Sequence, residues 1–246
     1  MNRLRYLCAS AVLSLLLSGC SSPPHGQPLG DSEPIVPSQV VDFSTLYVQN
    51  CAGCHGVDGK GGAAIALANP VYLAIADDSV IRRTASKGVP GTPMPAFAQS
   101  AGGMLTEKQI DVIVGGIRAW AKPGVLGEQT PPSYAAQIAG DPQRGALAYK
   151  TYCSSCHGVD GHGGSKASSI VDGSYLALVS DQQLRTIVIA GRPELGAPDW
   201  RGDVQDRPMP AQEITDVVAW LSSQRPQSPG QPYPTSSTSR ANGGSR

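Results

Sequence analysis

Two cysteine pairs, each followed at once by a histidine, are the residues of this sequence best suited to chemistry. They are Cys51, Cys54 and His55 in CAGCH, and Cys153, Cys156 and His157 in CSSCH. Thiols and imidazoles of this kind bind metals, form disulfides, exchange reducing equivalents or attach a haem covalently. The spacing of the pairs and the elements that carry them decide among these chemistries.

The two pairs belong to an internal repeat. The segment CAGCHGVDGKGG at 51–62 recurs as CSSCHGVDGHGG at 153–164, with nine of twelve positions identical. A second block, 78–97, matches 181–200 without gaps, and the apolar positions of a third block recur in the same order near the end of each repeat. Three blocks in one order indicate a duplicated domain.

Covalent haem attachment explains the repeated motif better than its rivals. In CxxCH each thiol can form a thioether with a haem vinyl group, and the adjacent histidine reaches the iron. A zinc site would join the four thiolates in one tetrahedron, but the pairs lie 102 residues apart and each has its own histidine. The histidine after each cysteine pair, and the placing of each pair in its own repeat, also argue against a disulfide framework. Thioredoxin-like redox chemistry needs a βαβ setting that the sequence lacks.

Helices are expected to position both motifs. Asp42 and Asp141 are suited to begin a helix that runs into each CxxC. Gly88 and Gly191 are suited to end a middle helix, and Thr106 to begin a closing amphipathic helix. No segment has the pattern of a strand, so both domains are predicted to be all-α.

Composition agrees with two small domains that each need a large apolar cofactor. Aromatic residues make up only 5% of the 246 residues. Two cores of about 90 residues built from so few aromatics would be thin, and a haem in each would fill the gap. The formal net charge is zero, so no basic field indicates nucleic acid as a partner.

The N-terminus is expected to export and anchor the protein. Arg3 and Arg5 precede a short apolar run at 7–17, whose length suits a secretory signal better than a membrane span. The run ends in LSGC, which resembles a bacterial lipobox, so that residues 1–19 would be removed and Cys20 would carry lipid. An ordinary cleaved signal with a stray cysteine is the alternative.

We expect two domains between flexible segments in the mature chain. The segments are a tether at 20–39, domain one at 40–121, a Pro/Gly linker at 122–140, domain two at 141–224 and a disordered tail at 225–246. The protein would then be lipid-anchored on the periplasmic side of a bacterial membrane.

Each repeat resembles a class I c-type cytochrome. The resemblance rests on a helix, the extended motif CHGxDGxGG, a middle helix, an MPxF-type loop and a closing helix, over about 80 residues of each repeat. It implies two tandem cytochrome c-like helical domains with two covalently bound haem c groups. It also implies that His55 and His157 are proximal iron ligands, and that Cys51, Cys54, Cys153 and Cys156 hold the macrocycles. Arg82 and Arg185 would meet haem propionates or lie on a solvated helix face.

The repeats differ at the sixth iron ligand. Repeat one carries Met94 in GTPMPAF, where flanking prolines stiffen the loop, with Met104 as the alternative. In repeat two the gapless alignment places Ala197 opposite Met94, and the remaining methionine is Met209 in RPMPAQE. Met209 either binds the second iron through a re-routed loop or packs at the start of the last helix, which leaves that iron without a methionine. His162 is a further candidate, although it follows the proximal histidine closely.

The resemblance implies electron transfer rather than enzyme activity. A six-coordinate haem has no open position for a substrate, so it accepts and donates single electrons. We expect a membrane-tethered relay between respiratory redox proteins, such as a quinol-oxidising complex, a dehydrogenase or a terminal oxidase. The alternative, motivated by Ala197, is a dihaem peroxidase-like enzyme or a gas-binding protein with an open second haem. A structural lipoprotein with disulfide-bonded CxxC pairs would carry no haem.

Overall fold

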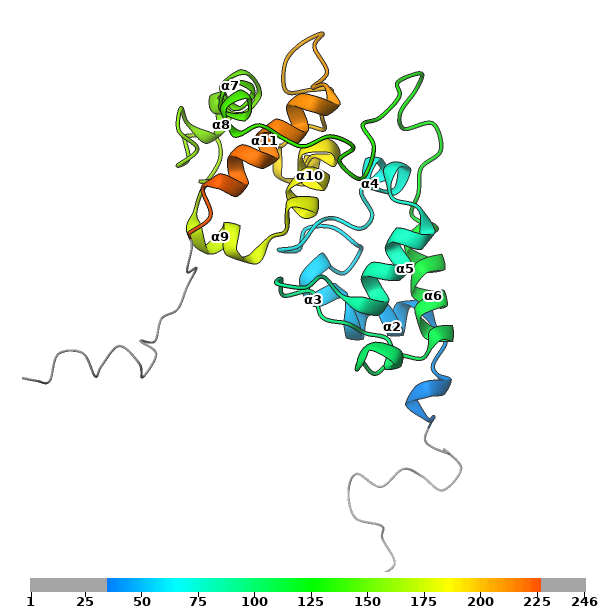
Figure 1. Ribbon diagram of the computed structural model, residues 1–246. Helices are drawn as coiled ribbons and strands as arrows, with labels where there is room; N and C mark the ends of the chain where they lie inside the picture. Colours follow the sequence, from blue (N-terminus) through cyan, green and yellow to red (C-terminus); the bar gives the residue numbers. More distant parts are fainter. Residues whose placement is uncertain (1–34, 227–246) are drawn as a thin grey trace, which may run out of the picture. The chain divides into compact units, whose positions relative to one another are not determined.

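The computed structural model describes residues 35–226, and these residues form helices but no strand (Figure 1). The prediction of an all-α fold is confirmed. The predicted signal peptide, Cys20, most of the tether and the tail from residue 227 lie outside the described residues. Both repeats belong to one compact unit that begins at Val40, and the 3-10 helix Pro37–Gln39 precedes it. Between residues 35 and 226 no helix has the length and apolar character needed to cross a membrane.

Repeat one contains five α-helices (Figure 1). They are α2 (Phe43–Asn50), α3 (Ala52–His55), α4 (Pro70–Ile75), α5 (Asp78–Lys87) and α6 (Glu107–Arg118), with the 3-10 helix Gln99–Ala101 before α6. The first CxxCH thus lies at the junction of α2 and α3, where the chain turns after Asn50.

Repeat two has the same helices in the same order. They are α7 (Pro142–Tyr152), α8 (Ser154–His157), α9 (Gly173–Leu178), α10 (Asp181–Ala190) and α11 (Ala211–Ser223), with the 3-10 helix Pro193–Leu195 after α10. The segment between α6 and α7, which was predicted to be a linker, consists of turns and irregular backbone.

Side-chain caps begin the helices where the sequence predicts them. Asp42 accepts a hydrogen bond from the Thr45 N–H at 2.7 Å, and Asp141 accepts from the first N–H groups of α7. Thr106 and Gln109 form a reciprocal capping box at the start of α6. The two six-residue helices α4 and α9 were not predicted from sequence, because so short an apolar segment has no readable period.

Glycine permits close crossings of the first and last helix in each repeat. A Cβ on Gly116 of α6 would lie 2.0 Å from the ring of Phe43 in α2. In repeat two the glycine is on the opposite helix, since a Cβ on Gly145 of α7 would lie 2.0 Å from the carbonyl oxygen of Asp216 in α11. The first and last helices of each repeat therefore approach each other closely, with the glycine on the last helix in repeat one and on the first helix in repeat two.

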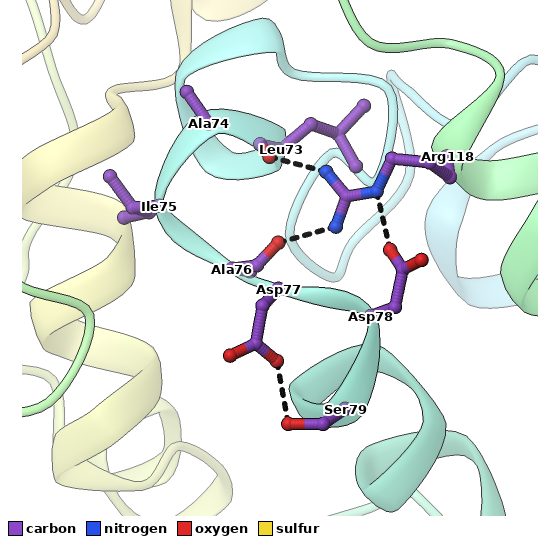
Figure 2. Close-up of a pocket in the computed structure, with 8 residues that line it drawn as sticks. All are labelled: Leu73, Ala74, Ile75, Ala76, Asp77, Asp78, Ser79 and Arg118. Atoms are coloured by element: carbon purple, nitrogen blue, oxygen red, sulfur yellow. Dashed lines mark hydrogen bonds and ion pairs between the residues drawn. The ribbon is translucent and has the colours of Figure 1, made fainter.

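One arginine ties the closing helix of each repeat to the junction of its two middle helices. In repeat one Arg118 donates to the carbonyl oxygens of Leu73 at 2.5 Å and Ala76 at 2.6 Å, and pairs with Asp78 at 2.6 Å (Figure 2). In repeat two Arg225 binds the equivalent groups. These are the carbonyl oxygens of Leu176 and Val179 and the carboxylate of Asp181. Sequence alignment does not pair these arginines, because Arg118 ends α6 whereas Arg225 lies beyond the end of α11.

The segment before α7 is held against repeat two by Arg185. This side chain is only 3% exposed and donates to the carbonyl oxygens of Ser133 and Tyr134 and to the hydroxyl of Thr215. The expectation that Arg185 lies on a solvated helix face is wrong, because its guanidinium is buried among protein acceptors. Arg82, its counterpart, forms a surface ion pair with Asp111.

A buried carboxylate joins the two ends of repeat two. Asp216 of α11 is 2% exposed and accepts hydrogen bonds from the Asp141 N–H at 2.8 Å, from Arg144 at 2.9 Å and from Gln212 at 2.9 Å. Burial by itself would raise the pKa of Asp216, but these hydrogen bonds outweigh it and hold the pKa below its usual value. The start of α7 is therefore fixed to α11 by the charged form of this carboxyl.

Replacing Asp216 by alanine is expected to lower the free energy of unfolding by about 2–3 kcal/mol, because the partly buried N–H of Asp141 and the side chains of Arg144 and Gln212 lose a buried acceptor. The matched control is Asp111→Ala, which removes the surface partner of Arg82 and should cost about 0–1 kcal/mol. Urea unfolding of the haem-loaded protein, followed by circular dichroism, measures both. Equal losses in the two variants would contradict the assignment.

The same carboxylate predicts a pH dependence with a defined sign. The pKa of Asp216 is lower in the folded than in the unfolded protein. Its contribution to the free energy of unfolding is therefore complete above the unfolded pKa of about 3.9, and it is lost as the pH falls through the folded pKa. The stability difference between wild type and Asp216→Asn should therefore shrink below about pH 4. A difference that stays constant from neutral pH to pH 3 would rule out this origin.

Candidate haem sites

Each CxxCH histidine is oriented by a hydrogen bond from its own ring. His55 Nδ1 lies 2.8 Å from the carbonyl oxygen of Ile65, and His157 Nδ1 lies 2.7 Å from that of Ser168. A carbonyl oxygen only accepts, so Nδ1 carries the proton and Nε2 keeps its lone pair. A backbone carbonyl on one ring nitrogen is the arrangement that directs the other nitrogen at a metal.

The first histidine is buried in a way that favours its neutral form. His55 is 7% exposed, and burial lowers its pKa, with a further lowering by the positive charge of Arg192. The hydrogen bond to the Ile65 carbonyl acts in the opposite direction but does not reverse the shift. The imidazole is therefore kept in the uncharged state that a metal ligand requires.

The four thiols of the two motifs are not joined in disulfides. Burial, with a smaller contribution from Cys54, raises the pKa of Cys51 to about 11. Burial, together with Asp203 and Cys156, raises the pKa of Cys153 to about 12. The reactive form in thiol exchange and in zinc binding is the thiolate, which these environments disfavour. Within residues 35–226 no group of three or more His, Cys, Asp or Glu side chains is placed to hold a metal ion.

Glycines let the chain turn back tightly after each histidine. Gly56 has a φ of +83°, and a Cβ there would lie 1.8 Å from the Lys60 carbonyl oxygen. A Cβ on Gly62 would lie 2.2 Å from the carbonyl oxygen of Cys54. The loop 56–62 is thus closed against the backbone of its own motif, which brings Ile65 within reach of the histidine ring.

Aromatic side chains of α2 and of the turn after α6 contact this loop. The hydroxyl of Tyr47 donates to the Gly56 carbonyl at 2.9 Å, and its ring meets that of Trp120 edge-on at 5.0 Å. In repeat two Tyr149 donates to the Gly158 carbonyl and stacks on Trp220 at 4.4 Å. Sequence reasoning missed these four residues, although a tyrosine four residues before each CxxCH was a signal that could have found two of them.

This set of groups fits a covalently attached haem. Each repeat offers an imidazole with its Nε2 lone pair free and two unpaired thiols on the same helical turn. The fit follows from the donor chemistry and from the backbone carbonyl that orients each ring. The roles of these six side chains stay predictions.

The methionines occupy different environments. Met94 is half-buried in its loop, where the Val89 N–H donates to its carbonyl oxygen at 3.0 Å. Met104 is 84% exposed, and the residue that packs at the entrance of α6 is its neighbour Leu105. Met209 is 1% exposed. Its assignment as the second sixth ligand stays a prediction.

Hydrogen bonds connect the two repeats close to the first motif. Asn69, which caps α4, donates to the Ala190 carbonyl at the end of α10 at 2.9 Å. Arg192 donates to the Gly62 carbonyl at 2.9 Å and pairs with Glu194 at 2.5 Å. The glycine loop of repeat one is therefore bound by a charged side chain of repeat two.

The contacts of Gly62 predict a steric test of the first site. Gly62→Ala should lower the free energy of unfolding by about 1–3 kcal/mol and reduce haem attachment in repeat one, because its Cβ meets backbone atoms. Gly53→Ala is the matched control, since nothing lies within 4 Å of a Cβ there. Thermal unfolding and haem content measure both variants. If Gly62→Ala behaved like Gly53→Ala, the closed loop described here would be incorrect.

Two solved structures are similar to parts of this chain. The c-type cytochrome KustC0563 is 29% identical, with a TM-score of 0.29, over 33% of this chain and 99% of that one. The Kuenenia stuttgartiensis reducing HAO-like protein complex Kustc0457/Kustc0458 is 21% identical, with a TM-score of 0.40, over 75% of this chain and 96% of the matched one.

A curated relative and a family model are also similar to this chain. The cbb3-type cytochrome c oxidase subunit CcoP of Azospirillum sp. (strain B510) is 30% identical over 140 residues, which are 52% of this chain and 42% of that protein. The chain thus spans less than half the length of this relative. Residues 39–115 and 140–221 match the family described as cytochrome c oxidase, cbb3-type, subunit III. Since this match takes in both CxxCH motifs and more than half of the chain, the protein belongs to that family of c-type cytochromes, in which haem c is covalently bound.

Proposed function

We propose that this protein is a dihaem c-type cytochrome that relays single electrons. The observation that carries the proposal is the duplicated histidine geometry, in which His55 and His157 each donate through Nδ1 to a backbone carbonyl and leave Nε2 free. The match of both repeats to one cytochrome family supports a haem in each.

The chain's own residues would hold each haem and shield its iron. Cys51 and Cys54 would fix the first macrocycle, and Cys153 and Cys156 the second. Bound haem supplies reversible one-electron chemistry. The burial of His55 excludes water from the proximal side of the first site and keeps its ring neutral. Met94 is the proposed sixth ligand there, and a thioether in that position raises the reduction potential.

The hydrogen bonds between the repeats suit a relay. Arg192 and Asn69 attach the glycine loop and α4 of repeat one to the end of α10. Electron transfer over two hops requires that the two carriers keep a defined arrangement. These bonds favour such an arrangement over independent motion of the domains.

The proposed place of the relay is the periplasmic side of a bacterial membrane, held there by lipid on Cys20. The lipobox-like LSGC supports the anchor. A terminal oxidase complex is the proposed electron acceptor, since the name of the relative from Azospirillum is that of a subunit of a cbb3-type oxidase. A quinol-oxidising complex or a dehydrogenase is the proposed electron donor.

The haem content of the full chain tests the proposal. Protein matured with a c-type cytochrome assembly system should contain two covalent haems per chain, measured as the pyridine adduct after denaturation. A variant with Cys51 and Cys54 both replaced by alanine should retain one, and so should the variant with Cys153 and Cys156 replaced. A reductive titration of the wild type should take up two electrons per chain.

Other haem contents would overturn the proposal. A chain with no covalent haem would favour the disulfide-bonded lipoprotein, and a chain with one haem would exclude the relay between two. The matched control is Ser154→Ala, which changes a residue between the second pair of cysteines whose hydroxyl bonds to the Lys150 carbonyl and not to a thiol. It should retain both haems.

A further inference from the structure

The loop that should supply the sixth ligand has the same backbone register in both repeats. The Val89 N–H donates to the Met94 carbonyl at 3.0 Å in repeat one. The Arg192 N–H donates to the Ala197 carbonyl at 2.9 Å in repeat two. The hydrogen bond that holds Met94 in place therefore holds an alanine in the second repeat.

Glycine contacts fix this register independently. A Cβ on Gly88 would lie 2.6 Å from the carbonyl carbon of Pro95. A Cβ on Gly191 would lie 2.5 Å from the carbonyl carbon of Pro198. Each glycine thus packs on the residue that follows the ligand position. No slip of the loop places another residue where Ala197 lies.

Met209 has a different structural counterpart, namely Leu105. The Leu105 N–H donates to the Phe97 carbonyl at 2.8 Å, and the Met209 N–H donates to the Trp200 carbonyl at 2.7 Å. Both residues directly precede the N-cap of the closing helix. Residues 98–104 are seven and residues 201–208 are eight. The extra residue is therefore taken up within the loop, and Met209 keeps the register of Leu105.

Burial of the two side chains agrees with this equivalence. Leu105 is 6% exposed and Met209 is 1% exposed, and both belong to the hydrophobic core. Turning the Met209 side chain towards an iron would vacate a filled core position, and re-routing its backbone would break the hydrogen bond to Trp200. Met209 acts as a core residue in this arrangement.

The remaining histidine of repeat two is poorly placed to replace a methionine. His162 is exposed and lies five residues after His157, in the same glycine turn, where its N–H bonds to Asp160. Between residues 141 and 226 the sequence has no further histidine or methionine beyond Met209. Repeat two thus lacks a counterpart of the Met94 thioether.

We propose that the second haem lacks a methionine ligand and binds a small diatomic molecule at its sixth position. The proposal rests on the proposed function, because it requires that repeat two hold a haem. The first haem, with Met94, would exchange electrons with the second, whose iron is open. The site would therefore take ligands such as CO or NO that bind ferrous haem directly.

Carbon monoxide tests the proposal on the full, dihaem chain. The reduced wild type should show a CO-induced spectral shift that corresponds to one of the two haems. Met209→Leu, which restores the residue of repeat one, should leave that shift unchanged. Ala197→Met should abolish it, since the thioether returns at the register of Met94. Proton NMR of the reduced wild type should show one methionine methyl shifted upfield by a haem ring, not two.

Several outcomes would overturn the inference. If the wild type gave no CO shift and Met209→Leu gave one, Met209 would be the ligand. If neither gave a shift, another side chain would bind the iron. Two upfield methionine methyls would exclude an open site even if Ala197→Met failed to fold. The number of covalent haems per chain is measured in every sample. Fewer than two haems would refute the proposed function, whereas two haems without a CO shift would refute only the open sixth position.

Discussion

One hydrogen bond in each repeat, from the histidine Nδ1 to a backbone carbonyl, is the interaction on which the rest of the structure depends. It joins His55 to Ile65 and His157 to Ser168, so the chain must turn back within ten or eleven residues. That return is possible because Gly56 and Gly158 take φ values of +83° and +82°, which a side chain would oppose. A tyrosine and a tryptophan of each repeat then contact a loop that is already closed. The loop carbonyl sets the orientation of the histidine ring, and the helices hold the loop in place.

The closing helix of each repeat is attached by a guanidinium, and the chain reaches this contact in two ways. Arg118 is the last residue of α6, whereas Arg225 follows α11, yet both bind two carbonyl groups and an aspartate at the same junction. The acceptors come from aligned positions, such as Asp78 and Asp181. What the two repeats share is thus a pair of backbone carbonyls that accept hydrogen bonds. A long arginine side chain can donate to them either from the last turn of the closing helix or from just beyond it.

Local signals made the helices predictable, while tertiary contacts hid parts of the site. Asp42, Thr106 and Gly88 begin or end helices through neighbours within four residues, so their types are informative in sequence. The carbonyl partners of the histidines carry no such signal, because every residue has a carbonyl. Arg185 was assigned to a haem propionate or to solvent, but its partners come from a segment about fifty residues away in the chain. The CxxCH residues could be singled out from the sequence because they lie within five consecutive positions, and their roles stay predictions.

The tripeptide PMP shows how one local pattern can have two physical causes. Around Met94 the prolines lie in an irregular loop and restrict its backbone. Around Met209 the second proline, Pro210, is the N-cap of α11 with a φ of −65°, a place where its missing N–H costs nothing. The same letters therefore stiffen a loop in repeat one and begin a helix in repeat two. The backbone hydrogen bond from Met209 to Trp200 favours the second role for Met209, because it matches the bond from Leu105 to Phe97. Similarity of the two PMP sequences alone does not show this equivalence. Duplication has preserved the contacts that orient each histidine, whereas the position of Met94 has become Ala197 in repeat two.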